Sequence, residues 1–432
     1  MIPTFREYLL PTFLFLDMQT HDAEKAKFTP YQVVAIVLLT LTQFTVVLDF
    51  MVMSPLGDML MKSMSLSTSQ FGLAVSAYAF SAGASGLMTA GFADRFDRKK
   101  LLLFFYVGFI AGTLFCGLAT SYAMLIAARI ITGLFGGVMG SIALAIIADL
   151  FPIQQRGRAM GFTQMGFGAS QVLGIPIGLY IANHWGWQSP FLMIVGLATL
   201  TWLVVLVKMR PITKHLELKT EKNAFSHLWH TMKLKYYRVG FLSTALLSLG
   251  GFMMMPWGSA FAINNLKVTY GQLPILFMAS GLVALVVMPL VGKLSDKIDK
   301  VKIFFFAAIW TMVAIIIYTN LTVIPFWMVI ALNILLMIGI LSRIVPAMAL
   351  VSAIPKMQDR GAFMSINSSL QQIAGGIAAA VGGLIVVQKT KTSPLEHYNT
   401  LGYVISGIII FNIIMVYRMN KIIKAQQHAT KL

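Results

Sequence analysis

Long apolar runs, separated by short polar segments, extend along almost the whole chain. A helix of about 20 apolar residues crosses the roughly 30 Å hydrocarbon core of a bilayer. The pattern therefore predicts an all-α polytopic membrane protein with twelve transmembrane helices. The expected spans are 31–55, 69–91, 100–119, 123–150, 158–183, 187–208, 238–262, 272–292, 302–320, 324–350, 361–387 and 400–418.

The polar segments between the spans divide the chain into domains. We expect an N-terminal leader at 1–30, a six-helix bundle at 31–209, a charged linker at 210–237, a second six-helix bundle at 238–418 and a tail at 419–432. The apolar stretch at 8–16 is too short to span a bilayer and fits a signal peptide poorly. We interpret the leader as a floppy or interfacial segment without a role in the mechanism.

Composition agrees with this architecture. Hydrophobic residues make up 58% of the 432 positions and charged residues 11%, whereas soluble domains have roughly 45–50% and about 25%. A water-soluble globular protein and a disordered chain are both excluded. The single cysteine, Cys116, excludes a disulfide framework and a cysteine-based metal site, and we expect no metal.

In a soluble protein, the net charge of +18 would suggest nucleic acid as a partner. In a membrane protein, the distribution of the basic residues between the loops indicates how the chain is oriented in the bilayer. With the N-terminus inside, 27 of the 33 Lys and Arg residues fall in inner segments and four in outer loops. Cytoplasmic loops carry such an excess, so both termini are predicted to be cytoplasmic, in the plasma (inner) membrane. We expect no nucleic-acid partner.

The two halves of the chain repeat each other. The segments Gly91–Lys99 and Gly292–Lys300 share two aspartate positions: Asp94 and Asp296 are 202 residues apart, as are Asp97 and Asp299. An even number of spans in each half makes the repeat parallel, with its axis along the membrane normal.

These segments resemble the loop motif of the major facilitator superfamily, and the resemblance covers about residues 31–418. Gly292–Lys300 follows the motif closely, and the first copy keeps its Asp-Arg-x-x-Arg-Lys skeleton. Arg129 followed by Gly133 resembles the family's span 4 motif, and Gly168–Gly178 approximates the span 5 motif of its antiporters. The resemblance is to the twelve-helix drug/proton antiporter and sugar-efflux-like branch. It implies two six-helix bundles that rock around a midplane site.

Asp49 and Arg129 are the charged residues most suited to proton coupling. Asp49 lies deep in span 1, where a carboxylate costs several kcal/mol unless it is paired or protonated. Arg129 lies at a similar depth in span 4 and is its natural partner. The family pattern links the span 4 arginine to proton transfer. The alternatives are a solvated Asp49 near the outer interface and a static strut between two helices.

A second group of charges lies at the cytoplasmic ends of spans 2 to 5. We interpret it as a charge latch that holds the halves together when the cavity faces outward, with Asp94 also able to cap a helix. Topogenic charge alone would explain the basic residues but not the aspartates. The latch residues are Asp94, Arg95, Arg98, Asp149 and Arg156, repeated more weakly by Asp296.

Polar side chains in the spans are expected to face the bundle interior and form a substrate cavity. Arg343 can bind an anionic substrate there or extend to the inner interface. Ordinary helix packing is the alternative role for the others. The predicted cavity residues are Gln43, Gln164, Gln171, Trp257, Asn264, Asn333, Arg343 and Gln371.

Nothing in the sequence indicates an enzyme or a cofactor, and no G-x-x-x-x-G-K-[ST] loop suggests ATP coupling. The expected function is proton-coupled antiport of a small amphipathic compound or drug. The alternative is a proton symporter or facilitator that imports a small metabolite or sugar. The symmetric layout argues against a membrane-embedded enzyme or receptor scaffold. The expected partners are the substrate, protons and the lipid bilayer, with the chain acting as a monomer.

Overall fold

The computed structural model describes residues 27–89, 95–213, 216, 224–356 and 359–431. Twelve helical segments in these residues are long and apolar enough to cross a membrane, which confirms the predicted all-α architecture. Six belong to the first half of the chain: α2 (Pro30–Val52), α4 (Thr68–Thr89), α5 (Arg98–Gly117), α6 with α7 (Tyr122–Gly136, Met139–Leu150), α8 with η2 and α9 (Ile153–Ala169, Ser170–Gly174, Ile175–Trp185), and α10 (Ser189–Lys208).

The second half repeats this arrangement. Its spans are α12 with η4 and α13 (Lys235–Phe252, Met255–Trp257, Gly258–Asn264), α14 (Leu273–Lys297), α15 (Lys300–Thr319), α16 (Phe326–Ala353), α17 (Arg360–Ile385) and α18 (Tyr398–Lys431). Two shorter helices lie between spans: α3 (Gly57–Met64) and α11 (Ala224–Lys233). The stretch expected to be a plain solvated linker thus contains a helix, and α18 continues through most of the expected tail.

The repeated aspartates begin equivalent helices. Asp97 accepts a hydrogen bond from the backbone N–H of Lys99 at the start of α5, and Asp299 accepts one from Val301 at the start of α15. A side-chain oxygen at this position satisfies an N–H that the helix leaves unpaired. The cap of α5 is therefore Asp97; Asp94, for which we expected a capping role, lies outside the described residues.

Three of the spans are interrupted where the backbone must change direction or lose a hydrogen bond. Between α6 and α7, Gly137 lies so close to α4 that an added Cβ would be 2.5 Å from Ala82 Cα. The π-turn η2 is followed by Pro176, and η4 contains Pro256. Proline lacks an N–H donor, so each helix shifts its hydrogen-bond register near these residues.

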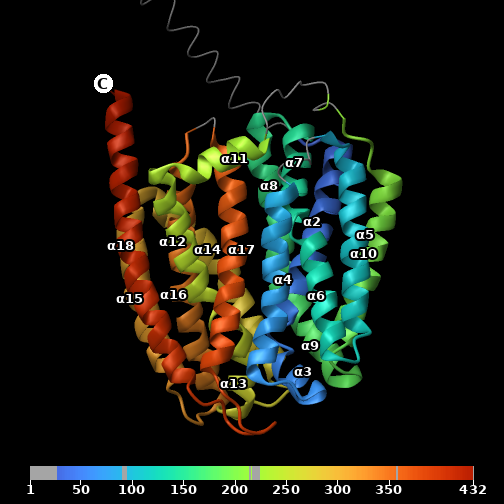
Figure 1. Cartoon of the computed structure of the whole chain (residues 1–432), viewed down its shortest axis with the longest axis vertical. Helices are drawn as coiled ribbons and strands as arrows, with labels where there is room; N and C mark the ends of the chain where they lie inside the picture. The colour runs from blue at the N-terminus through green and yellow to red at the C-terminus, as the bar shows by residue number, and fades with distance from the viewer. Residues whose placement is uncertain (1–26, 90–94, 214–215, 217–223, 357–358, 432) are drawn as a thin grey trace, which may run out of the picture.

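The two halves stand side by side and meet where α4 and α17 run together through the middle of the molecule (Figure 1). Glycines allow this approach: a Cβ added at Gly72 would lie 2.7 Å from the backbone oxygen of Ala379. Ser76 Oγ donates a 2.7 Å hydrogen bond to the backbone oxygen of Gly376. In a membrane, no hydrophobic force drives one helix against another. Small residues stabilise the contact because they let the two backbones pack closely.

The two ends of the bundle differ. We call the end with α11 and the chain's C-terminus the linker end, and the opposite end, with α3 and α13, the α3 end (Figure 1). Hydrogen bonds between the halves gather toward the α3 end, where Ser259 Oγ donates to the backbone oxygen of Ser54 and Thr68 Oγ1 donates to that of Val386. On the other side of the interface, α14 contacts the first half mainly at η2 and α9. The halves are therefore closed against each other at the α3 end.

Candidate functional site

The central feature of the first half is a fully buried ion pair. Arg129 Nη1 on α6 lies 2.8 Å from Asp49 Oδ2 on α2, and both side chains are 0% exposed. Thr113 Oγ1 on α5 donates a 3.1 Å hydrogen bond to the other carboxylate oxygen. Three helices thus hold one carboxylate at a fixed point. The structure brings the expected partners together, and Asp49 is not solvated.

An aromatic chain leads from this ion pair to the second half. The Arg129 guanidinium lies 4.6 Å from the centre of the Tyr78 ring on α4. Tyr78 is 5.1 Å from Phe50 on α2, and Phe50 is 5.7 Å from Phe252 on α12, measured between ring centroids. Phe252 lines a cavity in the second half. A change in the position of Arg129 can therefore reach that cavity through direct contacts.

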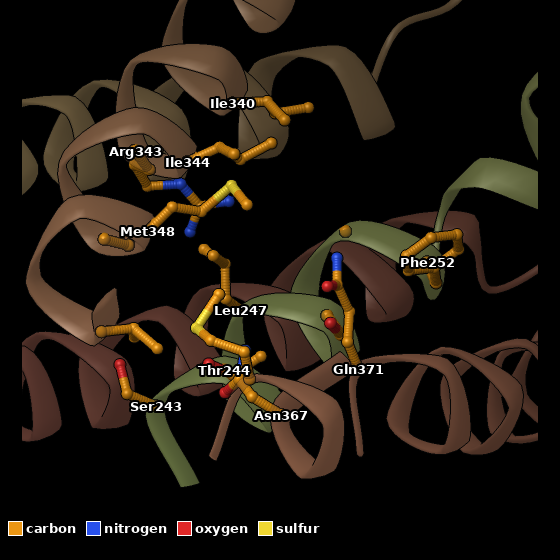
Figure 2. A pocket seen from close by; sticks show the side chains of 15 residues that line it. Ser243, Thr244, Leu247, Phe252, Ile340, Arg343, Ile344, Met348, Asn367 and Gln371 are labelled. Atoms are coloured by element: carbon orange, nitrogen blue, oxygen red, sulfur yellow. The ribbon is translucent and has the colours of Figure 1, made fainter. Parts of the chain in front are cut away.

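The cavity has a volume of about 110 Å³ and lies among α12, α16 and α17. Figure 2 shows the guanidinium of Arg343 turned from α16 toward Leu247 on α12. The lining residues are Ser243, Thr244, Leu247, Ser248, Gly251, Phe252, Ile340, Arg343, Ile344, Ala347, Met348, Val351, Met364, Asn367 and Gln371.

Two of the predicted cavity residues, Arg343 and Gln371, line this cavity. Arg343 is 2% exposed, so its side chain does not extend to the membrane interface, the alternative we considered. Asn367 also lines the cavity and lies one helical turn before Gln371 on α17. Asn367 is one of the span amides expected to face the bundle interior, but it was not among the predicted cavity residues; its spacing of four residues from Gln371 on one helix face could have indicated it.

The other predicted cavity residues lie elsewhere. Trp257 is fully buried and packs edge-to-face on Phe71, 5.5 Å between ring centroids, so it is a core residue at the α3 end. Asn333 accepts a 2.6 Å hydrogen bond from Ser280. Asn264 donates to Asp58 at the α3 end. The remaining three, on α2, α8 and η2 of the first half, are not among the lining residues: Gln43, Gln164 and Gln171.

The described residues of the predicted charge latch include an ion pair. Arg98 Nε on α5 lies 3.2 Å from Asp149 Oδ2 on α7, so the pair joins two helices of the first half. Arg156 instead donates to the backbone oxygens of Phe151 and Ala148, and the side chain of Arg95 is exposed. Asp94 lies outside the described residues, as does the side chain of Asp296.

A polar cluster that we did not predict joins the halves at the α3 end. Asp58 on α3 is 1% exposed and accepts hydrogen bonds from Lys62, Asn264 and the hydroxyl of Tyr270. Lys62 Nζ also reaches Asn264 Oδ1 at 3.2 Å. Burial and the Asp58 carboxylate raise the pKa of the Tyr270 hydroxyl, which keeps it protonated as a donor. We name Asp58, Lys62, Asn264 and Tyr270 the α3-end cluster.

A second unpredicted contact fixes α11 to the second half. Asp359, just before α17, accepts a 2.8 Å hydrogen bond from the Tyr237 hydroxyl, and its other oxygen lies 3.0 Å from His227 Nε2 on α11. Burial raises the pKa of Asp359, but the hydrogen bonds from Tyr237 and His227 outweigh it, so the pKa is lowered overall. The carboxylate therefore stays charged at neutral pH.

Comparison with known families decides the identity of the fold. The sequence matches the family model described as "Major Facilitator Superfamily" over residues 39–254 and 240–429. The chain belongs to the major facilitator superfamily. It is therefore a secondary transporter of the membrane and not an enzyme, as expected from its sequence.

Several curated proteins are similar to parts of the chain. The vacuolar membrane amino acid uptake transporter fnx2 of Schizosaccharomyces pombe is 36% identical over 137 residues, which are 32% of this chain and 24% of that protein. The multidrug resistance protein fnx1 of the same yeast is 32% identical over 117 residues, 27% of this chain and 22% of that protein. The uncharacterized MFS-type transporter YceJ of Bacillus subtilis is 26% identical over 259 residues, 60% of this chain and 66% of that protein. The matches thus span less than two thirds of each relative.

Solved transporter structures share the fold over nearly the whole chain. A bacterial homologue of the human lysosomal transporter Spinster, in an inward-facing and unoccupied conformation, has a TM-score of 0.69 at 16% identity and covers 92% of this chain and 97% of its own. A D-xylose–proton symporter has a TM-score of 0.72 at 17% identity, covering 90% and 97%. At these identities the likeness establishes the fold alone.

Proposed function

We propose that this transporter couples the export of a small amphipathic compound to the entry of protons, with Asp49 as the proton-carrying group. The observation that carries the proposal is the buried Asp49–Arg129 pair. An ion pair out of contact with water is costly unless its geometry is good, and intramembrane ionisable residues commonly mark proton pathways. A proton that neutralises Asp49 leaves Arg129 without its carboxylate partner.

The release of Arg129 gives a physical route for coupling. The cation lies over the Tyr78 ring, which continues through Phe50 to Phe252 at the second-half cavity. Protonation of Asp49 therefore biases the packing between the halves where substrate would sit. A ligand can shift such an equilibrium only by its differential affinity for the two states.

The ends of the bundle would alternate in closing. In this structure the α3-end cluster supports closure at the α3 end. We propose that Asp94, Arg95, Arg156 and Asp296 support the opposite state, in which the linker end is closed, while the Arg98–Asp149 pair holds α5 and α7 together within the first half. The excess of Lys and Arg indicates that the linker end is cytoplasmic.

The same charge pattern supports the proposed placement of the chain. We propose that both termini are cytoplasmic in the plasma (inner) membrane, that 31–209 and 238–418 move as the two bundles, and that the monomer is functional.

Single cysteines in a Cys116→Ala background test the topology. Thr213→Cys, at the linker end, should react with an impermeant maleimide only after lysis, and Thr269→Cys, at the α3 end, in intact cells. The reverse labelling would overturn this orientation.

Proton-linked uptake is the second candidate function. It is favoured by the similarity of part of the chain to fnx2, an amino acid uptake transporter. Uptake and export use the same fold and the same buried carboxylate, so the direction of proton movement separates them.

The direct experiment measures proton movement in proteoliposomes that contain a pH-sensitive dye. A panel of anionic, neutral and cationic amphipathic compounds of matched size is added outside. A compound that is transported should drive a proton flux that Asp49→Asn loses. Glu396→Gln is the matched control, since Glu396 is a 41% exposed carboxylate paired with Lys389 on the surface. An equal flux in Asp49→Asn and wild type would contradict the proposal.

A further inference from the structure

Arg343 is a buried cation for which the described residues supply no counter-ion. Its side chain is 2% exposed, and its Nε has no hydrogen-bond partner among the described residues. Arg129, which is also buried within a span, has the Asp49 carboxylate at 2.8 Å. A buried charge without a partner costs several kcal/mol, because the interior replaces neither its hydration nor its counter-charge.

The surroundings of Arg343 would suit an anion. None of the fifteen residues that line the cavity, all in the described part of the chain, is acidic. Thr244, Ser248 and Gln371 bring further hydrogen-bond donors to the same cavity from α12 and α17. A guanidinium presents its N–H groups in a planar fork that matches carboxylate and phosphate oxygens. The site is thus equipped for an anionic group.

The rest of the cavity is apolar. Figure 2 shows Ile344 and Met348 on the same side as Arg343, with Leu247 opposite. Methionine and branched aliphatic side chains form adaptable apolar surfaces. The volume of about 110 Å³ exceeds the roughly 10–15 Å³ that a single water needs, so the cavity has room for a small ligand. A ligand that fills it therefore has an anionic head and a short apolar body.

We propose that this cavity is the binding site for a small amphipathic anion and that Arg343 is its charge partner. The inference rests on the proposed transport function, because it assigns the chemical class of the substrate. It also places the two tasks in different halves of the molecule: the proton at Asp49 on α2, and the substrate at Arg343 on α16.

Binding can be tested with hexanoate, hexane-1-sulfonate and hexyl phosphate as anionic probes, with hexanamide and hexylamine as neutral and cationic matches. Unfolding of the purified full chain is followed by reaction of its single, buried cysteine, Cys116, with a thiol dye. A ligand that binds the folded state raises the unfolding midpoint. We expect at least one anion to raise it at concentrations where hexanamide and hexylamine have no effect. The three anions distinguish carboxylate, sulfonate and phosphate as the head group.

Variants locate the effect at Arg343. Arg343→Gln should weaken anion binding by about 10- to 100-fold, as expected for the loss of a charged hydrogen-bond partner. Arg343→Lys, which keeps the charge but not the fork, should lie between Arg343→Gln and wild type. Arg360→Gln removes an exposed arginine at the start of α17 and should bind like wild type. If Arg343→Gln does not fold, Arg343→Lys and the comparison of probes on the wild type still decide the question.

The proposal is overturned if hexanamide or hexylamine stabilises the chain as well as the anions do, if chloride alone matches them, or if Arg343→Gln keeps wild-type affinity. These outcomes are independent of proton coupling. Proton flux driven only by cationic compounds and lost in Asp49→Asn would overturn the anion site and leave the coupling proposal intact. Anion binding that is lost in Arg343→Gln, without any proton flux in the wild type, would support the anion site and overturn the coupling proposal.

Discussion

Replacing Asp58 with asparagine should open the α3 end. Asp58 accepts three hydrogen bonds, and two of them, from Asn264 and Tyr270, cross from the second half to the first. Of the three bonds to Asp58, only these two are broken when the halves separate at this end, because Lys62 lies on α3 with Asp58. The substitution removes the charge on which both depend and leaves Lys62 without its carboxylate.

The size of the effect follows from these two bonds. A hydrogen bond exchanged for one with water contributes about 0.5–1.5 kcal/mol, so the pair contributes about 1–3 kcal/mol to closure at the α3 end. At about 1.4 kcal/mol for each factor of ten, Asp58→Asn should lower the ratio of closed to open states by about 5- to 150-fold. A shift of this size is readily seen if the two states lie within a few kcal/mol of each other.

The assay is a distance distribution between spin labels at Ser65→Cys and Thr269→Cys, in a Cys116→Ala background. Both positions are exposed and lie on opposite sides of the α3-end interface. The wild-type chain should give one short distance, and Asp58→Asn should add or enlarge a longer one. Glu396→Gln, which breaks an exposed surface ion pair on another loop, should leave the distribution unchanged.

Unchanged distances in Asp58→Asn would refute the reasoning, since the α3-end cluster would then contribute nothing to closure. An equal shift in Glu396→Gln would also refute it, because the response would reflect general loss of surface charge. Tyr270→Phe removes one of the two crossing bonds and should produce a smaller shift of the same sign.

Three further predictions concern other parts of the molecule. Asp359→Asn should speed amide exchange in α11, because it removes the carboxylate that contacts His227. In the wild-type chain, hydrogen bonds lower the native pKa of Asp359. Its stabilisation of α11 should therefore be complete at pH values above the ordinary Asp pKa of about 3.9 and should be lost only as pH falls through the lower native pKa. Gly72→Ala should lower the unfolding midpoint, at a cost of about 1–3 kcal/mol, because its Cβ would lie 2.7 Å from the Ala379 oxygen; Gly196→Ala, with open space around it, should not. Exchange of one monovalent anion for one proton moves two charges, so a potential of about 100 mV should change the driving force by about 4.6 kcal/mol, whereas symport of the two should be insensitive to it.

The architecture could be predicted from the sequence because its causes are local. Span length and apolar content determine which segments cross a bilayer, and twelve such segments are present. The repeated aspartates at Asp97 and Asp299 likewise act within one helical turn as caps. The pairing of Asp49 with Arg129 could be predicted from the depth of the two residues in the membrane, because a buried acid needs a partner at the same depth in its half-bundle.

The α3-end cluster could not be predicted in the same way. Asp58 follows a short break after α2 and resembles a loop residue, while its partner Asn264 lies 206 residues away in the other half. The pairing depends on how the halves dock, which no local pattern encodes. For the same reason Asn264 and Trp257 were expected in the cavity: polar and aromatic character shows that a residue faces the interior, but not at which depth or against which helix.

The claim that Asp49 carries the coupled proton is tested most directly by separating uphill transport from exchange. Proteoliposomes containing Asp49→Asn are assayed for accumulation of a transported compound under a proton gradient, and for exchange of labelled for unlabelled compound without one. Asparagine resembles a protonated aspartate in size and polarity, so exchange should remain within a few-fold of wild type while accumulation falls to background. Accumulation at the wild-type rate would contradict the account and leave the Asp49–Arg129 pair as a structural link between helices.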